Sequence, residues 1–442
     1  MSTSISTGRF AAVKSVFPIK FSKFRLSFAS LGLTAGLVCA PVQAGEVEVL
    51  HYWTSGGEAA AISVLKDLVG DAGHQWKDFA VTGGGGGNAN EILRQRVLKG
   101  DAPASAQIKG LDIKRWARLG FLQNLDNLAV QERWDSVLPE VVANTMKHQG
   151  HYVSTPVNVH RTNWMWINKS ILDEVGGKVP QTWQEFESIA KKIQARGYTV
   201  VAHGKQSWQD ATVFESVALA VGGSDFYREA FVNHNSKAMK GETMSKVFDQ
   251  YRRLKPFFAD NLANDDWNTA TAEVINGRAA FQFMGDWAKG EFTAAGKQPN
   301  VDYICAPMPG TNGKFLFNID SLAMFRLSDP QKKAAQQDLV KEIMGETFQV
   351  AFNLNKGSIP ARTDIRLDRF DQCAKDSMTQ FISAAESGDL VPSIAHGMAT
   401  TSQVQSEFYQ VIYDFFNGKE VTSRTAARTL SKKIRYGQLL LK

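Results

Sequence analysis

Two aromatic rings and a carboxylate stand where a predicted strand meets a predicted helix. Residues 46–53 alternate and are rich in strand-forming types, so they predict a strand that ends at Tyr52 and Trp53. Neighbouring side chains on a strand point to opposite faces, so we expect one ring in the core and the other in a crevice. Glu58 completes a Ser55-x-x-Glu58 capping box. With about four acceptor positions, its carboxylate can also receive hydroxyl protons from a ligand.

The common motifs of covalent and metal chemistry are missing from the sequence. It contains no H-E-x-x-H, no G-x-S-x-G and no C-x-x-C, and its eight His residues do not fall at zinc spacings. We therefore expect no enzyme, no metal and no cofactor. An exported glycosidase stays open, because the separation of two carboxylates is a three-dimensional property.

A run of five glycines, residues 83–87, lies between a predicted strand and a predicted helix. Residues 84–89 formally match the dinucleotide pattern G-x-G-x-x-A, but a glycine run matches many patterns by accident. No Gly-Lys-Ser/Thr follows it. We favour a flexible loop at the carboxyl edge of a sheet, where ligands of many kinds bind.

The first 44 residues have the composition of a secretory signal peptide. They carry five basic residues and no acidic one, then an apolar run over residues 31–40, and Val42-Gln43-Ala44 before the expected cleavage. The apolar run is shorter than the roughly 20 residues of a membrane-spanning helix. Cys39 suggests a lipoprotein, but no Leu stands three positions before it. We therefore expect a free periplasmic protein.

The charge and the length of the remaining chain indicate its class of partner and its number of domains. Most of the net charge of +6 belongs to the signal segment, so the high isoelectric point predicts no nucleic-acid partner. Residues 45–442 exceed what one hydrophobic core usually supports, so we expect two domains. Cys305 and Cys373 could pair in an oxidising compartment, but their distance in sequence leaves the pairing open.

Strand, loop and helix follow one another twice near the start of the mature chain. Residues 46–53 lead into a helix through Ile62, Leu65 and Val69, and residues 78–81 lead into a helix that begins at residue 88. This succession predicts an α/β layer with parallel strands. Further strands are predicted at residues 197–203, 278–284 and 321–325, helices at 211–221 and 265–275, and a mostly helical end.

Segments over nearly all of the mature chain resemble the extracellular solute-binding proteins of bacterial ABC importers, family 1, and most closely the periplasmic glucose-binding branch. The matching segments are residues 49–58, 106–110, 116–122, 157–161, 202–212, 277–281, 285–287, 317–321, 355–362 and 395–398. One departure is that the glucose-binding pattern has Trp-Trp where this chain has Tyr52-Trp53. A Tyr still offers a ring face for stacking.

The resemblance implies the type II periplasmic binding protein fold, with two α/β lobes, each a mostly parallel sheet flanked by helices, around a ligand cleft. It implies three crossings, near residues 157–161, 315–320 and 358–363. The expected division is a signal peptide (1–44), a first lobe (45–157 and 319–360), a second lobe (158–318) and a helical segment (361–442) that belongs mainly to the second lobe.

The resemblance also implies which side chains meet a sugar. A pyranose has apolar C–H faces and a rim of hydroxyls, so its site needs aromatic rings and charged groups. Several tryptophans, among them Trp53, Trp208, Trp267 and Trp287, adjoin turn residues or charges instead of an apolar stripe. The predicted substrate-binding residues are Tyr52, Trp53, Glu58, Lys109, Trp287, Asn318, Asp320, Lys356 and His396. We expect Lys109, Lys356 and His396 to donate, and Glu58 and Asp320 to accept.

The resemblance implies that the protein captures a monosaccharide by hinge closure, with glucose as the favoured sugar. Its expected partners are the sugar and an ABC permease with a cytoplasmic ATPase, and the protein is expected to be a monomer. The alternatives are another sugar such as mannose, an oligosaccharide, or the glycosidase named above.

Overall fold

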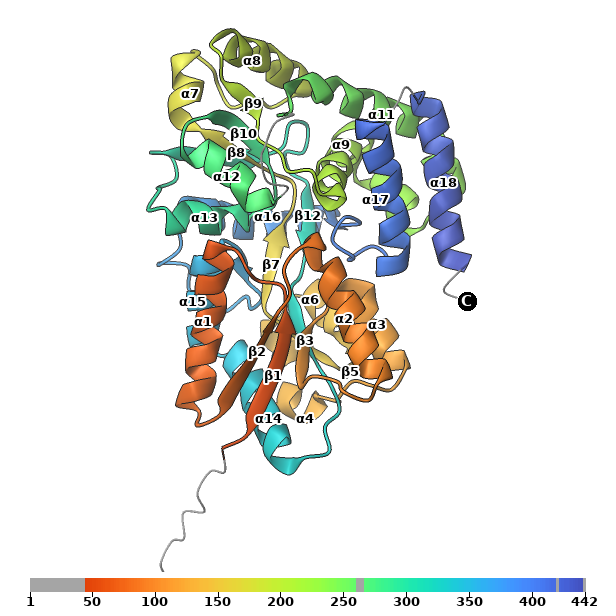
Figure 1. The fold of residues 1–442 in the computed structure, drawn as a ribbon. Helices are drawn as coiled ribbons and strands as arrows, with labels where there is room; N and C mark the ends of the chain where they lie inside the picture. The colour runs from red at the N-terminus through yellow and green to blue at the C-terminus, as the bar shows by residue number, and fades with distance from the viewer. Residues whose placement is uncertain (1–43, 260–265, 419–420, 440–442) are drawn as a thin grey trace, which may run out of the picture. The chain divides into compact units, whose positions relative to one another are not determined.

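The computed structural model describes residues 44–259, 266–418 and 421–439 (Figure 1). The predicted signal segment, apart from Ala44, lies outside these residues, so its cleavage stays a prediction. Among the described residues, no helix combines the length and apolar character needed to cross a membrane.

The first lobe is built on a five-stranded sheet in the order β2-β1-β3-β13-β6. In chain order, its strands are β1 (Glu46–His51), β2 (Gln75–Ala80), β3 (Ser105–Gln107), β6 (Ser154–Pro156) and β13 (Ser321–Met324). Its helices are α1 (Gly56–Asp71), α2 (Gly87–Leu98), α3 (Gly110–Arg118), α4 (Asp126–Gln131), α5 (Trp134–Val137), α6 (Glu140–Met146), α14 (Pro330–Met344) and α15 (Glu346–Lys356). Ile62, Leu65 and Val69 of α1, spaced three and four residues apart, are buried in this core with Val47 and Val49 of β1.

The second lobe is built on a four-stranded sheet in the order β11-β8-β10-β9. Its strands are β8 (Trp164–Asn168), β9 (Thr199–Val201), β10 (Ala279–Phe283) and β11 (Tyr303–Pro307). Its helices are α7 (Lys169–Glu174), α8 (Trp183–Ala195), α9 (Ser207–Tyr227), α10 (Ser236–Met239), α11 (Glu242–Leu254), α12 (Trp267–Ile275), α13 (Ala288–Ala294), α17 (Ser402–Asn417) and α18 (Ser423–Leu439). Its core is rich in Phe, with Phe186, Phe214 and Phe248 fully buried.

A third sheet contains the segments expected to cross between the lobes. Its order is β14-β7-β12-β15, with β7 (Asn158–Arg161), β12 (Phe315–Asn318), β14 (Ile359–Pro360) and β15 (Leu390–Pro392), and α16 (Gln372–Ser387) contacts it. Figure 1 shows β7 and β12 between the elements of the two lobes. Strands β14, β7 and β12 are neighbours, so the three chain crossings lie side by side.

Each lobe's sheet is mostly parallel, with one strand reversed. In the first lobe only β13 runs against the others, and in the second lobe only β8 does. Both reversed strands directly follow a crossing strand, since β8 follows β7 and β13 follows β12. A strand that enters a lobe directly from the crossing sheet runs away from the crossing sheet. The other strands of the lobe run toward the crossing sheet and end there. The carboxyl ends of those strands are where ligands bind in open α/β sheets.

Cys305 and Cys373 form a disulfide bond, which the sequence had left open. The bond links β11 of the second lobe to the first turn of α16, 68 residues further along the chain. It therefore ties the segment that follows the third crossing to the second lobe.

We expect the double variant Cys305→Ser/Cys373→Ser to unfold more easily than the wild type. The chain-entropy model gives about 4 kcal/mol of stabilisation for a closed loop of 68 residues. Urea denaturation of both proteins, with and without a reductant, measures the difference. Equal midpoints for oxidised wild type and variant would contradict a stabilising role.

Candidate ligand-binding site

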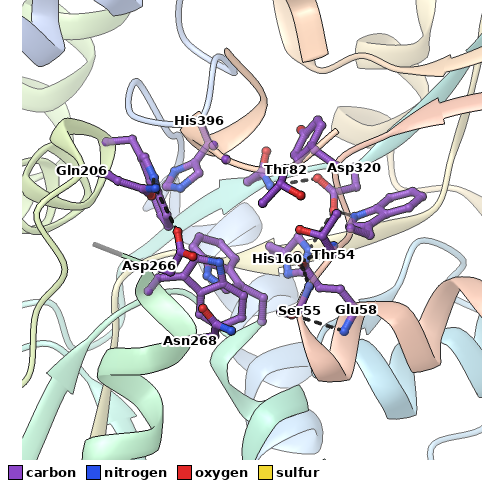
Figure 2. Close-up of a pocket in the computed structure, with 18 of the residues that line it drawn as sticks. Thr54, Ser55, Glu58, Thr82, His160, Gln206, Asp266, Asn268, Asp320 and His396 are labelled. Atoms are coloured by element: carbon purple, nitrogen blue, oxygen red, sulfur yellow. Dashed lines mark hydrogen bonds and ion pairs between the residues drawn. The ribbon is translucent and has the colours of Figure 1, made fainter. Parts of the chain in front are cut away.

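A cavity of about 180 Å³ lies where the two lobes and the crossing sheet meet, and Figure 2 shows its lining. The first lobe supplies Thr54, Ser55 and Glu58, and the second supplies residues such as Gln206 and Asp266. Eight of the nine predicted residues line it: Tyr52, Trp53, Glu58, Trp287, Asn318, Asp320, Lys356 and His396. The ninth, Lys109, stands behind the lining, with its Nζ atom 5.4 Å from the centre of the Tyr52 ring.

Trp53 belongs to the buried core of the first lobe, as expected for one of the two rings, and Tyr52 packs against that core; both residues also line the cavity. Strand β1 ends at His51, so the two residues directly follow the strand. Trp53 is only 2 % exposed and packs edge-on against Phe352 at 5.4 Å. Its ring is therefore held rigidly.

The second lobe contributes several tryptophans to the cavity, of which only Trp287 was among the predicted substrate-binding residues. Trp208 begins α9 and Trp287 precedes α13, and their ring centres lie 6.3 Å apart. The His396 ring lies 5.0 Å from that of Trp287, and Trp267 also lines the cavity. Trp208 and Trp267 were already conspicuous because they adjoin turn residues and charges.

The glycine run closes the cavity between these aromatic groups. A Cβ atom on Gly85 would stand 3.1 Å from the Trp208 ring, and one on Gly86 would stand 2.9 Å from the Tyr52 ring. Both residues have positive φ angles, 57° and 98°. The run is needed for close packing against two rings, which accounts for the glycines without a dinucleotide.

The Asp320 carboxylate has three hydrogen-bond partners at the cavity wall. Its Oδ2 atom accepts from Trp53 Nε1 at 3.2 Å and lies 3.1 Å from His160 Nε2, and its Oδ1 atom accepts from Asn318 Nδ2 at 3.3 Å. Burial alone would raise the Asp320 pKa, but His160 and two lysines outweigh it and hold the pKa well below its usual range. Asp320 is therefore an ionised acceptor at the cavity wall.

His160, which the site prediction missed, joins this carboxylate to the second lobe. Its Nδ1 atom bonds Asp286, which precedes α13, and its ring lines the cavity. Burial lowers the His160 pKa, but the Asp286 and Asp320 carboxylates outweigh burial and the pKa lies above its ordinary value. No sequence motif marks this role, because the three residues are brought together only by folding.

We expect the stability lost in the variant His160→Gln to depend on pH. The raised folded-state pKa means that protonated His160 contributes fully below its unfolded pKa of about 6.5, and that this contribution is lost as pH rises through the folded value. The pKa of Asp320 is shifted in the opposite direction, so ionised Asp320 loses its contribution to stability only under acidic conditions. Urea denaturation from about pH 6 to pH 10 measures the free energy of unfolding of both proteins. The difference between wild type and variant should become smaller as the pH rises. A constant or growing difference would contradict the charged pairing.

Glu58 and Lys356 form a buried ion pair at the cavity. The capping box is present, since Glu58 Oε2 accepts from the backbone N–H groups of Thr54 at 3.1 Å and Ser55 at 3.2 Å. Glu58 Oε1 accepts from Lys356 Nζ at 2.5 Å. Lys356 is 3 % exposed, so it is not a surface lysine. Three acceptor positions of Glu58 are occupied, which leaves about one for a ligand.

Two polar atoms of the lining have no hydrogen-bond partner among the described residues. They are Asn318 Oδ1 and His396 Nε2, both buried. Burial, only partly offset by Glu215, lowers the pKa of His396, so its ring is neutral and one of its nitrogens is an acceptor. Such atoms are costly to bury without a partner, so they mark positions that a ligand can satisfy.

The family model for bacterial extracellular solute-binding proteins matches residues 46–337. A probable sugar-binding periplasmic protein of Brucella suis is 45 % identical over 406 residues, which cover 91 % of this chain and 95 % of that protein. One of Rhizobium meliloti, described in the same words, is 46 % identical and covers 88 % and 93 %. Among solved structures, a chitin oligosaccharide binding protein aligns with a TM-score of 0.77 over 90 % of this chain and 99 % of that one. At 16 % identity, that likeness shows the fold alone.

Proposed function

The chain belongs to the bacterial extracellular solute-binding proteins. From this premise we propose that it captures one monosaccharide in the periplasm, with glucose as the favoured sugar. The two relatives described as probable sugar-binding periplasmic proteins support the ligand class and the compartment. The sugar is then delivered to an ABC permease driven by a cytoplasmic ATPase. The protein performs no covalent chemistry and acts as a monomer.

The observation that carries this proposal is the combination of rings and acceptors around one small cavity. Aromatic faces suit the C–H faces of a pyranose, while Asp320, Asn318 and His396 offer acceptors for its hydroxyl protons. The cavity of about 180 Å³ lies below the roughly 300 to 1,000 Å³ of pockets for drug-sized ligands. This favours a single sugar ring over a longer glycan.

Binding proceeds by closure of the lobes about the crossing strands. A sugar that contacts Asp320 and Glu58 together with Trp287 and His396 binds the closed state more tightly than the open one, and that difference drives closure. In this proposal the first lobe comprises residues 45–157 and 319–360. Residues 158–318 and most of 361–442 make up the second.

Isothermal titration calorimetry of residues 45–442 tests the proposal with glucose, mannose, galactose and short oligosaccharides. We expect a monosaccharide to bind and oligosaccharides to give little or no heat. Thermal unfolding supplies an independent measure, because a ligand at 100 times its dissociation constant stabilises the protein by about 2.7 kcal/mol. Absence of binding to any of these sugars would overturn the ligand class, and tight binding of oligosaccharides alone would overturn the size argument.

The glycosidase alternative is less consistent with the carboxylates of the cavity. A glycosidase needs a carboxylic acid with a raised pKa beside the scissile bond. Here the pKa of Asp320 is lowered, and Glu58 is bound to Lys356. Release of reducing sugar from an oligosaccharide would nevertheless identify an enzyme, and we expect none.

A further inference from the structure

Glu215 of α9 is fully buried, does not line the cavity, and is surrounded by hydrogen-bond donors. Its Oε1 atom accepts from Thr162 Oγ1 at 3.1 Å and Ser393 Oγ at 2.7 Å. Its Oε2 atom accepts from Tyr227 at 3.0 Å and from the Ala395 backbone N–H at 3.0 Å, and it lies 2.9 Å from Ser393 Oγ. Four groups therefore converge on one carboxylate that takes no part in the proposed ligand contacts.

The hydrogens in this cluster are arranged around a carboxylate that accepts. The Tyr227 hydroxyl accepts from the Ile394 backbone N–H at 3.0 Å, so its own proton goes to Glu215. The Ala395 N–H can only donate. A carboxylate that accepts from all four neighbours satisfies every donor of the cluster, and the single proton of Ser393 then also points to Glu215. The Ser393 oxygen is then left to accept.

His396 receives its orientation from that oxygen. Its Nδ1 atom lies 2.8 Å from Ser393 Oγ, which accepts here, so Nδ1 carries the proton of the neutral ring. The other nitrogen, Nε2, is therefore bare. It is buried, has no partner among the described residues, and belongs to a ring that lines the cavity (Figure 2).

We propose that Glu215, acting through Ser393, fixes His396 Nε2 as an acceptor, so that the site selects a ligand that presents a hydroxyl donor at this position. Glu215 is a positioning residue for specificity and touches no ligand itself. The inference rests on the proposed function for the identity of the ligand as a sugar, but the tautomer of His396 is a property of the protein without ligand. It gives His396 the opposite role to the one expected from the sequence, where His396 donates.

The variant Glu215→Gln should reverse the hydrogen bond between Ser393 and His396. The Ala395 N–H requires the amide oxygen at the Oε2 position, so the amide NH₂ occupies the Oε1 position, facing the hydroxyls of Thr162 and Ser393. Both hydroxyls can accept. The shorter contact of Ser393 Oγ, 2.7 Å against 2.9 Å, is to the Oε1 position, so we expect Ser393 to accept from the amide there and to donate to His396 Nδ1. The ring proton then moves to Nε2, which becomes a donor.

Nitrogen-15 NMR of the ligand-free protein, labelled at His, reads the tautomer directly, because a bare ring nitrogen resonates far downfield of a protonated one. A His396→Gln variant assigns the signals. We expect the Nδ1–H form in the wild type and the Nε2–H form in Glu215→Gln. Asp210→Asn is the matched control, since it removes another buried carboxylate of α9 that bonds a histidine, His203, outside the cavity lining. It should leave the His396 signals unchanged.

The effect on ligand selection is measured with D-glucose and its deoxy and deoxyfluoro analogues. In these analogues each hydroxyl of the ring is replaced in turn. A fluorine cannot donate, so in the wild type both analogues should lose about tenfold in affinity at the hydroxyl that faces His396. In Glu215→Gln the fluoro analogue should bind more tightly than the deoxy analogue at that position.

An Nε2–H tautomer in the wild type would overturn the inference, even if Glu215→Gln fails to fold. So would an unchanged tautomer in a folded Glu215→Gln protein, or the same fluoro-to-deoxy ratio in both proteins. If the wild type binds none of the sugars, the proposed function fails. In that case the ligand-free NMR spectrum still decides whether Glu215 sets the tautomer.

Discussion

Replacing Asp320 by Asn is expected to weaken binding of D-glucose by about ten- to a hundredfold. Hydrogen bonds to charged groups contribute roughly 1.5 to 3 kcal/mol each, and every 1.4 kcal/mol is tenfold in affinity. Asn keeps the size of the side chain but removes the charge that orients Trp53, His160 and Asn318. A ligand hydroxyl thus loses an ionised acceptor, and the cavity loses the group that holds three of its lining residues. Isothermal titration calorimetry measures the change.

The same substitution should also lower stability, so binding has to be measured on folded protein. Removing one partner of a buried charged pair typically costs about 3 to 5 kcal/mol, and of its two carboxylate partners His160 would keep Asp286. Asp338→Asn is a suitable control, because Asp338 pairs with His74 in the first lobe and does not line the cavity. It should leave affinity unchanged. An Asp320→Asn protein that is folded and binds glucose like the wild type would place the ligand elsewhere.

Replacing Gly57 by Val is expected to weaken binding without any direct contact to the ligand. Gly57 lies in the first turn of α1, and its N–H donates to Glu291 Oε1 of α13 in the second lobe at 2.8 Å. A Cβ atom on Gly57 would come within 2.7 Å of the backbone of Gly290. Backbone cannot move aside as a flexible side chain can, so the two lobes could not approach as closely.

The expected loss is about five- to 150-fold in affinity for D-glucose. Overpacking typically costs 1 to 3 kcal/mol, and here the cost falls on the closed state that binds the sugar. Stability of the ligand-free open form should hardly change, since Val is no worse than Gly in a helix. Gly70→Ala is the matched control, because a Cβ atom on Gly70 of the same helix would meet nothing within 4 Å. Equal affinities of Gly57→Val and Gly70→Ala would contradict closure along this contact.

Local sequence patterns predicted the entrance of the site well. The alternation that leads into Tyr52 and Trp53, and the capping box at Glu58, act over a few residues, and the structure contains both the strand and the box. The same holds for β9, β10 and β13, which fall within the strands expected from composition. The predicted strand over residues 46–53 is two residues longer than β1, which ends at His51.

Contacts made only by folding could not be predicted from the residues alone. His160 and Glu215 carry no motif. His160 bonds Asp286 and Asp320, which lie 126 and 160 positions away in sequence, and Glu215 lies 178 residues from Ser393. The pairing of Cys305 with Cys373 is of the same kind. The resemblance to a known family supplied most of the polar site residues, since spacing alone would not have distinguished Lys356 from a surface lysine.

A crystal structure of residues 45–442 with D-glucose tests the central claim most directly. We predict one pyranose ring in the cavity between the aromatic residues, with hydroxyls on Asp320 Oδ and on His396 Nε2, and with the lobes in contact at Gly57 and Gly290. An empty cavity with the sugar bound elsewhere, or a sugar that touches only one lobe, would contradict it.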